Sequence, residues 1–311
     1  MREMSRQILG SKAEPLPRND ERIADVSDTL DGSKEAPKLQ EPRRNVEDTS
    51  QKFHNTEKIQ PEWDTTELLN GEVEAILSTA EVRRVRKLAG AKKKAFVELE
   101  GRGSAVYYED LSDAKSARAS YLVDKALGLN VAAVTVMREI NGKMGCLEQF
   151  IPDAESGTGS YKMLQKDENM KDQLVILGLF DALILNTDRH GWNVVLKGDK
   201  VYGIDHDSAF SGVSWAQFDT FMWEDIVGRK IPARIRDSIS SFDLDAEKKH
   251  ALRHDLLEVL DEESVNLFFD RYEKVKEIVM TGSLPTEDPR KRSYEQFRAF
   301  QEKVLPPDTF I

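Results

Sequence analysis

The sequence has few of the residues and patterns that mark several protein classes. Cys146 is the single cysteine among 311 residues, which excludes an intrachain disulfide framework and a zinc site built from several cysteines. No apolar run approaches the ~20 residues needed to cross a bilayer, and the first residues lack the continuous apolar stretch of a secretory signal. We therefore expect a cytoplasmic protein without stable membrane insertion. A secreted effector is an alternative, because a polar leader is a weak address.

The chain also lacks a positive net charge, and its first 52 residues lack aromatic side chains. Both absences limit the partners and the structure that we expect. The formal net charge is -11, which argues against nucleic acid as a partner. No aromatic residue precedes Phe53, and the same stretch is rich in proline and charged residues. Such a segment cannot bury enough apolar surface to offset its ordering entropy. We expect residues 1–60 to be disordered and to serve as a linker, a targeting arm or a tail that binds a partner.

Strand patterns and one helix follow from about residue 66. Apolar and polar residues alternate over 94–100 and 104–109 on either side of a glycine-containing turn, which predicts a hairpin. Apolar residues at helical spacing predict a helix over 113–128 that ends at Gly128. Two more strands flank Asn141-Gly142, a dipeptide typical of tight hairpins. The predicted order is strand, strand, helix, strand, strand.

The second half of the chain is mainly helical in pattern. LVILGLFDALIL, residues 174–185, predicts a largely buried helix, and NVVLKGDKVYGID, residues 193–205, predicts a short pair of strands. Further helical periodicity covers 245–260, 262–280 and 293–305, with charged outer faces. A strand-rich half joined to a helix-rich half makes this an α+β protein.

A polar cluster follows the buried helix directly. Asp188 is followed by Asn193 five residues later, and Asp205 ends the predicted strand pair. Phosphoryl transfer needs a carboxylate that orients or deprotonates the acceptor hydroxyl, and it needs oxygen ligands for Mg²⁺. Asp188 would be that base, and Asn193 and Asp205 would be metal ligands. An isolated Asp-Arg-His sequence would instead be a solvated loop, but the spacing to Asn193 and Asp205 disfavours that interpretation.

The neighbours of these residues have less specific roles. His190 would contact phosphate or orient Asp188, and Arg189 would pair with a carboxylate of a loop. His206 is more readily explained as structural than as catalytic. Asp207 is either an extra metal ligand or a turn former.

The two motifs NTDRHGWN and YGIDHDSAF resemble the catalytic and metal-binding motifs of the phosphoinositide 3/4-kinase-like atypical kinases, including bacterial members and the related HipA-type kinases. GSAVYYED is similar to the strand that carries the V-Y-K-P motif of that family. ASYLVDKALGL is similar to its following helix, VAAVTVMREINGKMGCLEQFI to its next hairpin and hinge, and TFMWEDI to a segment beyond the metal Asp. The resemblance covers roughly residues 66–280.

The resemblance implies a bilobal protein-kinase-like fold with ATP bound between the lobes. We expect an N-lobe over 61–150, a C-lobe over 151–285 and a helical tail over 286–311. Adenine would pair with backbone groups of the hinge near Glu148, Gln149 and Phe150. The family pattern gives Asp188 the catalytic role and Asn193 and Asp205 the Mg²⁺ roles, in agreement with the chemical interpretation of the residues.

Two positions depart from the family pattern. Tyr108 stands where the family has its phosphate-binding lysine, and Ala117 stands where a helix glutamate should orient that lysine. A tyrosine is a neutral donor where the chemistry needs a cation. Lys93 or Lys94 would supply the cation from the neighbouring strand, as in the with-no-lysine kinases, and a loop near Gly90 would add N–H donors. The alternative is that these lysines form a solvated run of charge.

The sequence thus favours an ATP- and Mg²⁺-dependent phosphotransferase, an atypical kinase whose acceptor is a protein. A small molecule or a lipid headgroup is a less supported acceptor, since no basic amphipathic helix is evident. The first alternative is a pseudokinase that senses nucleotide or binds a partner, motivated by Tyr108 and Ala117. The second is a nucleotidyltransferase on the same fold.

Overall fold

The computed structural model describes residues 68–88, 93–101, 103–159, 167–210, 226 and 228–284. The segment expected to be disordered, residues 1–60, lies outside these ranges, as do the helix predicted at 293–305 and the tail. The loop residues Gly90 and Lys92 also lie outside them. No helix among the described residues is long and apolar enough to cross a membrane.

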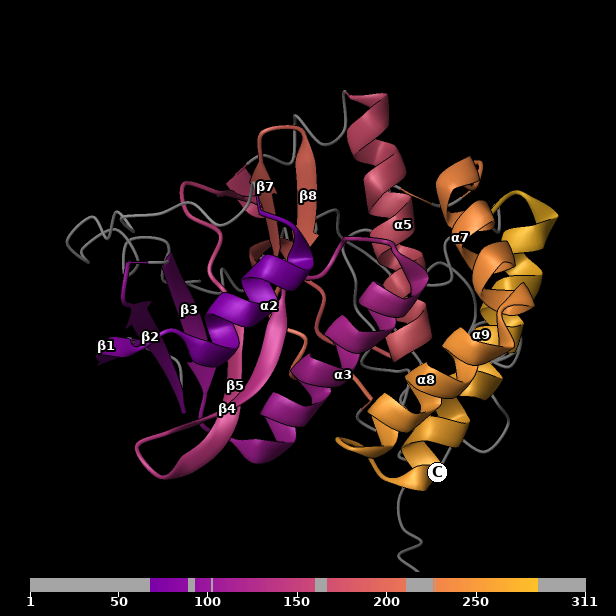
Figure 1. Ribbon diagram of the computed structural model, residues 1–311. Helices are drawn as coiled ribbons and strands as arrows, with labels where there is room; N and C mark the ends of the chain where they lie inside the picture. The colour runs from indigo at the N-terminus through magenta and orange to yellow at the C-terminus, as the bar shows by residue number, and fades with distance from the viewer. Residues whose placement is uncertain are drawn as a thin grey trace, which may run out of the picture. The chain divides into compact units, whose positions relative to one another are not determined.

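A five-stranded antiparallel sheet forms the first lobe. Its spatial order is β1-β2-β3-β5-β4, and helix α2 lies across one face (Figure 1). The β1–β2, β2–β3 and β4–β5 pairs join strands that are neighbours in the sequence, whereas the β3–β5 pair skips β4. The elements are α2 (Asn70–Thr79), β1 (Val82–Lys87), β2 (Lys94–Leu99), β3 (Gly103–Tyr108), β4 (Thr135–Ile140) and β5 (Lys143–Gln149).

The four predicted strands of this lobe are confirmed with small shifts of their ends. The turn between β4 and β5 has φ 52 at Asn141 and φ 77 at Gly142, the left-handed pair that a two-residue hairpin turn requires. Two elements were not predicted, helix α2 and strand β1. Strand β1 has the sequence VRRVRK and is mostly exposed, so it lacks the apolar alternation that identifies a half-buried strand.

Strand β1 changes the position of the basic segment that follows it. Lys93 and Lys94 lie after β1 in the chain and at the start of β2, and not ahead of the first strand of the sheet. Lys93 has φ 60 directly before β2, and Lys94 is the first residue of β2. The two adjacent lysines therefore have different backbone conformations. Only Lys94 belongs to a strand, so only its side chain is assigned to one face of the sheet.

Helix α3 (Leu111–Leu127) links the sheet to the helical lobe. Asp110 caps its start by accepting the N–H of Ser112 at 3.0 Å, and Gly128 ends it with φ 65. It contacts β3, β4 and β5 as well as α5, α7 and α8. The predicted helix over 113–128 is confirmed, and it begins two residues earlier because Asp110 provides the cap.

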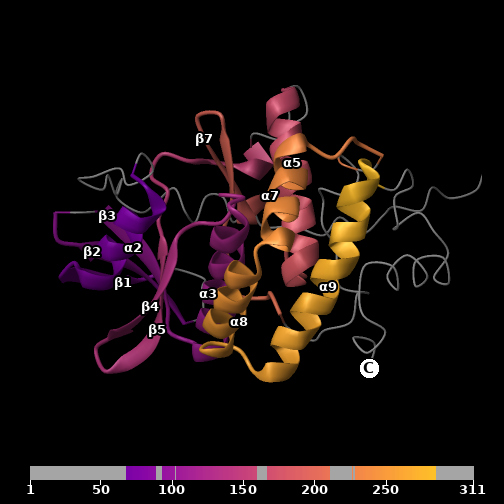
Figure 2. The ribbon, with the colours of Figure 1, turned by 45° about the vertical axis from the view of Figure 1, so that its right-hand side comes forward.

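The second lobe is helical with a small sheet of its own (Figure 2). The predicted helices over 174–185, 245–260 and 262–280 are confirmed, and the strand pair over 193–205 forms β7 and β8. Helix α7 was not predicted. The elements are β6 (Glu155–Ser156), α5 (Glu168–Ile184), η1 (Gly191–Asn193), β7 (Val194–Lys197), β8 (Lys200–Gly203), α7 (Ala233–Leu244), α8 (Ala246–Leu257) and α9 (Glu262–Thr281).

Helix α5 is the centre of the larger hydrophobic core. Twelve of its residues are buried, and it packs on α9 and β8. A helix that is apolar on all sides must be surrounded by other elements, so its position is fixed by packing. The chain leaves α5 at Leu185, whose φ of 52 turns it sharply. The residues that follow therefore start from a rigid point in the core.

Candidate functional site

Arg189 organises the loop that follows α5. Its Nε and Nη2 donate to the two carboxylate oxygens of Asp181, each at 3.0 Å, and neither side chain is exposed. Its Nη1 donates to the carbonyl of Ile204 at 2.8 Å and also to the carbonyl of Asn193. The expected partner was a loop carboxylate, but Asp181 belongs to helix α5. Arg189 thus ties the loop both to the core helix and to the end of β8.

Asp188 and His190 lie at the surface of this loop. The Asp188 N–H donates to Asn186 Oδ1 at 3.2 Å, and Asn186 in turn donates to Asp181 at 2.9 Å. These contacts fix the backbone of Asp188 and leave its carboxylate half exposed. His190 Nε2 is 3.8 Å from Asp188 Oδ2, which is longer than a hydrogen bond. The Asp188 carboxylate is therefore accessible from solvent.

Asn193 is buried in the short helix η1 and has a defined orientation. Its Nδ2 donates to the backbone carbonyl of Asp188 at 3.0 Å. This bond leaves Oδ1 as the free atom of the amide among the described residues. Its backbone carbonyl accepts the N–H of Ile204 at 3.0 Å. Ile204 directly precedes Asp205, so this bond connects the backbones of the two predicted metal ligands.

Asp205 follows β8 and has φ 58, a left-handed conformation that is uncommon outside glycine. Its Oδ1 accepts from Lys94 Nζ at 2.5 Å and from the Tyr108 hydroxyl at 3.3 Å, and its N–H donates to Glu148 Oε1 at 3.4 Å. Lys94 also contacts Asp207 Oδ2 at 2.7 Å. Burial raises the pKa of Asp205, opposed by the Lys94 charge and supported by Asp207.

Lys93 and Lys94, the two candidate cations of the sequence, have different partners. Lys94 lies directly opposite Tyr108 in the β2–β3 pair, and its Nζ is 4.6 Å from the centroid of that ring. Burial opposes its charge, but Asp205 and Asp207 outweigh burial and raise its pKa. Lys93 instead pairs with Asp110 at 2.5 Å, and its side chain is 64% exposed. Lys94 is therefore the lysine that meets the predicted metal ligand.

Tyr108 and Glu148 are buried beside Lys94. The Tyr108 hydroxyl donates to Glu148 Oε1 at 3.1 Å, and burial together with Glu148 and Asp205 holds its pKa well above its usual range. Burial and the neighbouring Asp205 raise the pKa of Glu148 to about 8. The role of the Glu148 side chain was missed, although a glutamate within the apolar strand CLEQF is a rare occurrence that marks a special environment.

Ala117 is buried in a small cluster with Tyr108, Ala114 and Cys146. Ala114 and Ala117 of α3 therefore pack on the side of Tyr108. The position of the missing helix glutamate is filled by apolar packing, and the carboxylates that pair with Lys94 are those of Asp205 and Asp207.

The predicted hinge has fewer free backbone donors than expected. The N–H of Gln149 donates to the Val134 carbonyl at 2.7 Å, and the N–H of Phe150 donates to the Ser104 carbonyl at 3.1 Å. Phe150 also makes an edge-to-face contact with Phe96, with ring centroids 5.1 Å apart. These two N–H groups are therefore used within the protein, and the Glu148 side chain is directed to Asp205.

His206 and Asp207 complete the segment after Asp205. His206 is buried against Phe180, with ring centroids 5.6 Å apart, and burial together with Arg189 holds its pKa well below its usual range. A neutral buried histidine agrees with the structural role expected of it. Asp207 accepts from Ser208 Oγ at 3.1 Å while it contacts Lys94, so it lies in a turn and also belongs to the charged network.

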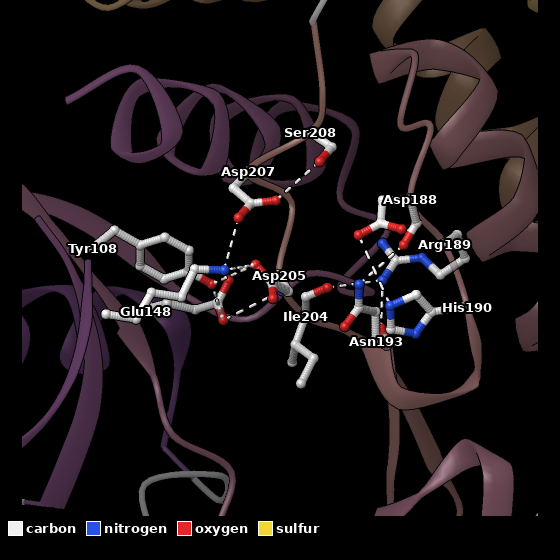
Figure 3. A network of polar contacts seen from close by, with 11 residues as sticks. Tyr108, Glu148, Asp188, Arg189, His190, Asn193, Ile204, Asp205, Asp207 and Ser208 are labelled. Atoms are coloured by element: carbon white, nitrogen blue, oxygen red, sulfur yellow. Dashed lines mark hydrogen bonds and ion pairs between the residues drawn. The ribbon is translucent and has the colours of Figure 1, made fainter. Parts of the chain in front are cut away.

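The polar residues thus form two groups that meet at Ile204 and Asp205 (Figure 3). We call Asp188, Arg189, His190 and Asn193 the loop group, and Lys94, Tyr108 and Glu148 the sheet group. The Asp205 carboxylate lies on the side of the sheet group. No hydrogen bond joins the side chains of Asp188, Asn193 and Asp205 to one another, and what connects the three positions is the backbone and Arg189.

The donor set fits a hard divalent cation that is also held by phosphates. Asn193 Oδ1 and the carboxylates of Asp205 and Asp207 are all oxygen donors, which Mg²⁺ and Mn²⁺ prefer. Among the described residues no cluster of three or more His, Cys, Asp or Glu side chains is arranged to hold a metal. Mg²⁺ in nucleotide sites is commonly held by one or two carboxylates of the protein, with its other ligands from phosphates and water.

Comparison with known proteins gives matches in structure only. No protein family and no curated protein matches the chain. A crystal structure of the Golgi casein kinase with Mn/ADP bound matches with a TM-score of 0.50 and 14% identity, over 70% of this chain and 78% of that chain. A further structure of the Golgi casein kinase has a TM-score of 0.49 at 14% identity, over 70% and 79%. The Helicobacter pylori proinflammatory kinase CtkA has a TM-score of 0.42 at 10% identity, over 72% and 98%.

At this level of identity the first match supports the fold alone. The chain has a mixed kinase-like fold, with an antiparallel sheet in the N-lobe and helices in the C-lobe.

Proposed function

We propose that this protein is an atypical kinase that transfers a phosphoryl group from ATP with the help of Mg²⁺ or Mn²⁺. The observation that carries the proposal is the contact between Lys94 and Asp205 at 2.5 Å. It brings a cation from the sheet to the predicted metal ligand. Lys94 lies opposite Tyr108, the position at which the resembled kinases have their lysine. The Golgi casein kinase, which shares the fold, was solved with Mn/ADP bound.

Each residue has a defined task in this proposal. Asn193 Oδ1 and Asp205 would hold the metal ion, which supplies charge neutralisation for the phosphates when bound. Lys94 would leave the carboxylates and contact the phosphate oxygens. Asp188 would accept the proton of the acceptor hydroxyl as its oxygen forms a bond to the γ-phosphorus. The bond from that phosphorus to the bridging oxygen breaks, and ADP leaves with the electron pair.

The finer assignments are part of the same proposal. We infer that the acceptor is a hydroxyl of a protein, because the Asp188 carboxylate is half exposed and the described part of the chain contains no basic amphipathic helix of the kind that binds membranes. The relationship to phosphoinositide 3/4-kinase-like and HipA-type kinases rests on the motifs alone. His190 would contact phosphate, since its ring is exposed beside Asp188. A cytoplasmic location stays a prediction from the sequence.

Adenine recognition would need groups other than the first hinge donors. The N–H groups of Gln149 and Phe150 are already bonded, so the base would contact the chain beyond Phe150 or through carbonyl groups. Phe96 and Val106 are cross-strand partners on the face that carries Lys94 and Tyr108. They would provide the apolar surface above the base.

The test of the proposal compares two adjacent lysines. The protein is incubated with labelled ATP, Mg²⁺ and candidate acceptor proteins, and transfer and hydrolysis are measured. Lys94→Met should lower the rate on the order of 100-fold, the effect of removing one charge-stabilising donor. Lys93→Met is the matched control and should retain the rate, because Lys93 pairs with Asp110 at the surface. Equal effects of both variants, or turnover that is unchanged in Asp188→Asn, would contradict the proposal.

The second candidate is a pseudokinase. The observation that favours it is the position of Lys94 between Asp205 and Asp207, where it neutralises the carboxylates that a metal ion would need. Calorimetric titration with Mg²⁺ and ATP separates the two functions, because a pseudokinase gives nucleotide binding without turnover or no binding. Mass spectrometry of reacted protein would reveal a nucleotidyl group if the transfer occurs at another phosphorus.

A further inference from the structure

Tyr108 and Glu148 make a closed set of contacts around Asp205. The Tyr108 hydroxyl is 3.1 Å from Glu148 Oε1 and 3.3 Å from Asp205 Oδ1. The same Glu148 oxygen accepts the Asp205 N–H at 3.4 Å. One residue therefore contacts the side chain of Asp205, the other contacts its backbone, and the two contact each other (Figure 3).

The strand register explains how these two side chains meet. Glu148 lies opposite Val106 in the β3–β5 pair, and Tyr108 lies opposite Cys146. Residues directly opposite each other share a face, and so do residues two positions apart on one strand. Tyr108 and Glu148 are thus diagonal neighbours on one face of the sheet. Both are almost fully buried, so their positions are fixed by packing.

Asp205 needs such support because its backbone is held in an unfavourable conformation. A left-handed φ is unfavourable for most residues with a Cβ, although Asp tolerates it better than most, and Asp205 has φ 58. Strand β8 has ended at Gly203, so the regular pairing of strands no longer fixes this residue. Arg189 and Asn193 hold the preceding Ile204, and the Asp205 N–H and Oδ1 bond to the sheet group.

Burial of the Glu148 carboxyl group lowers the stability of the fold, which suggests that the group has a function. Its Oε2 is buried and has no hydrogen-bond partner among the described residues. Such an atom lowers stability, and a native structure that keeps one usually has a functional reason. Replacement by a leucine would fill the same space without this cost. What leucine would remove is the acceptor for Tyr108 and for the Asp205 N–H.

We propose that Tyr108 and Glu148 are a positioning pair that fixes the backbone and the carboxylate of Asp205 for metal binding. This inference rests on the proposed function, because Asp205 is the proposed metal ligand. Tyr108 then stands at the position of the usual lysine but has a different role. Its hydroxyl orients the ligand as a neutral donor, and the cation is supplied by Lys94 from the neighbouring strand. Hydrogen bonds to ligating carboxylates commonly tune metal affinity in this way.

The experiment measures Mn²⁺ binding to the full chain, with ADP present, by electron paramagnetic resonance. Tyr108→Phe keeps the ring and its contact with Lys94 but removes the hydroxyl. Its Mn²⁺ affinity should fall about 10- to 100-fold, the usual effect of losing such a partner. Tyr107→Phe is the matched control, since the Tyr107 hydroxyl donates to the Lys143 carbonyl at 2.6 Å on the other face of the sheet. That variant should bind Mn²⁺ as the unaltered protein does.

Two variants of Glu148 separate positioning from packing. Glu148→Gln retains an acceptor oxygen for the Asp205 N–H and for Tyr108, so it should retain most of the Mn²⁺ affinity. Glu148→Leu fills the same space without an acceptor and should lose affinity as Tyr108→Phe does. Thermal unfolding of every variant identifies loss of folding, and the comparison of Tyr108→Phe with Tyr107→Phe carries the test if Glu148→Leu does not fold.

The outcomes of this experiment and of the turnover assay are distinguishable. Equal Mn²⁺ affinity in Tyr108→Phe, Tyr107→Phe and the unaltered protein would overturn the inference and leave the proposed function intact. Tight Mn²⁺ binding that depends on Tyr108, without phosphoryl transfer, would support the inference and reject the kinase. Absence of Mn²⁺ binding in the unaltered protein would overturn both.

Discussion

The loop group and the sheet group approach Asp205 from opposite sides, and they are built in different ways. The loop group comes from one continuous segment, and buried Arg189 connects that segment to helix α5 and to β8. The sheet group takes one residue from each of three strands, and its members meet because they share a face. The loop group has the spacing of the motif that it resembles in sequence, whereas the sheet group departs from the resembled pattern at Tyr108.

This difference has a physical explanation. In the loop group each residue depends on its neighbours in the chain, so a changed spacing would break several contacts at once. In the sheet group, Lys94 and Tyr108 lie opposite each other on adjacent strands. A lysine on either strand can therefore place its charge at nearly the same point. The carboxylate of Asp188 and the amide of Asn193 have no such second position in the loop.

The largest expected effect tests whether the loop group is the rigid side. Arg189→Met leaves Asp181 buried without its cation, so we expect the free energy of unfolding to fall by about 3–5 kcal/mol, as for other broken buried ion pairs. Urea unfolding followed by circular dichroism measures this. Lys94→Met is the comparison, because its ion pairs are partly exposed, and it should cost much less. Similar losses in both variants would show that the two groups do not differ in this respect.

The second effect concerns Asp124 in helix α3. Its carboxyl group holds Val131, which in turn pairs with Gly203 at the end of β8, two residues before Asp205. Asp124 Oδ1 accepts the Val131 N–H at 3.0 Å, and the Val131 carbonyl accepts the Gly203 N–H at 2.7 Å. Burial raises the pKa of Asp124 to about 7, opposed mainly by the backbone hydrogen bonds and less by Lys200 and Arg234. A raised carboxyl pKa means that its contribution to stability is present at low pH and is lost as the pH rises from about 4 to 7.

Asp124→Asn should remove this pH-dependent loss. At pH 8 we expect the variant to be more stable than the unaltered protein, by at most about 4 kcal/mol from the size of the pKa shift. At pH 4 the difference should vanish, because Asn keeps an acceptor for the Val131 N–H. Denaturant unfolding at several pH values measures the difference. Asp172→Asn, which removes an exposed charge, is the control, and a gain that is the same at every pH would refute the explanation.

The smallest effect tests how tightly the loop group is packed. A Cβ at Gly191 would lie 2.3 Å from Thr158 Oγ1, so Gly191→Ala should lower stability by about 1–2 kcal/mol through overpacking. Thr158→Ala in the same chain should restore part of the loss. Gly71→Ala is the control, because nothing lies within 4 Å of a Cβ at that helical position. Thermal unfolding checks all three, and a loss that Thr158→Ala leaves unchanged would argue against the contact.

Much of the fold follows from local patterns. The Asn141-Gly142 turn, the α3 helix that ends at Gly128 and the apolar α5 helix were predicted because each has a strong local signal. Strand β1 and helix α7 were not, since β1 is mostly exposed and α7 buries only Ile235, Ile239 and Phe242. The predicted partner of Arg189 was wrong in one respect. The sequence places Asp181 in a buried helix, and only packing reveals that the helix faces the loop.

The amino-acid sequence alone determined most of the strands and helices and the polar segment from Asp188 to Asp205, because these depend on short-range spacing. It narrowed the cation to two neighbouring lysines but could not choose between them. Tertiary structure decided that choice, since the pairing of β2 with β3 turns Lys94 toward Asp205 and leaves Lys93 at the surface. It alone also brought Glu148 and Tyr108 to Asp205, because side chains on different strands meet only when the sheet has formed.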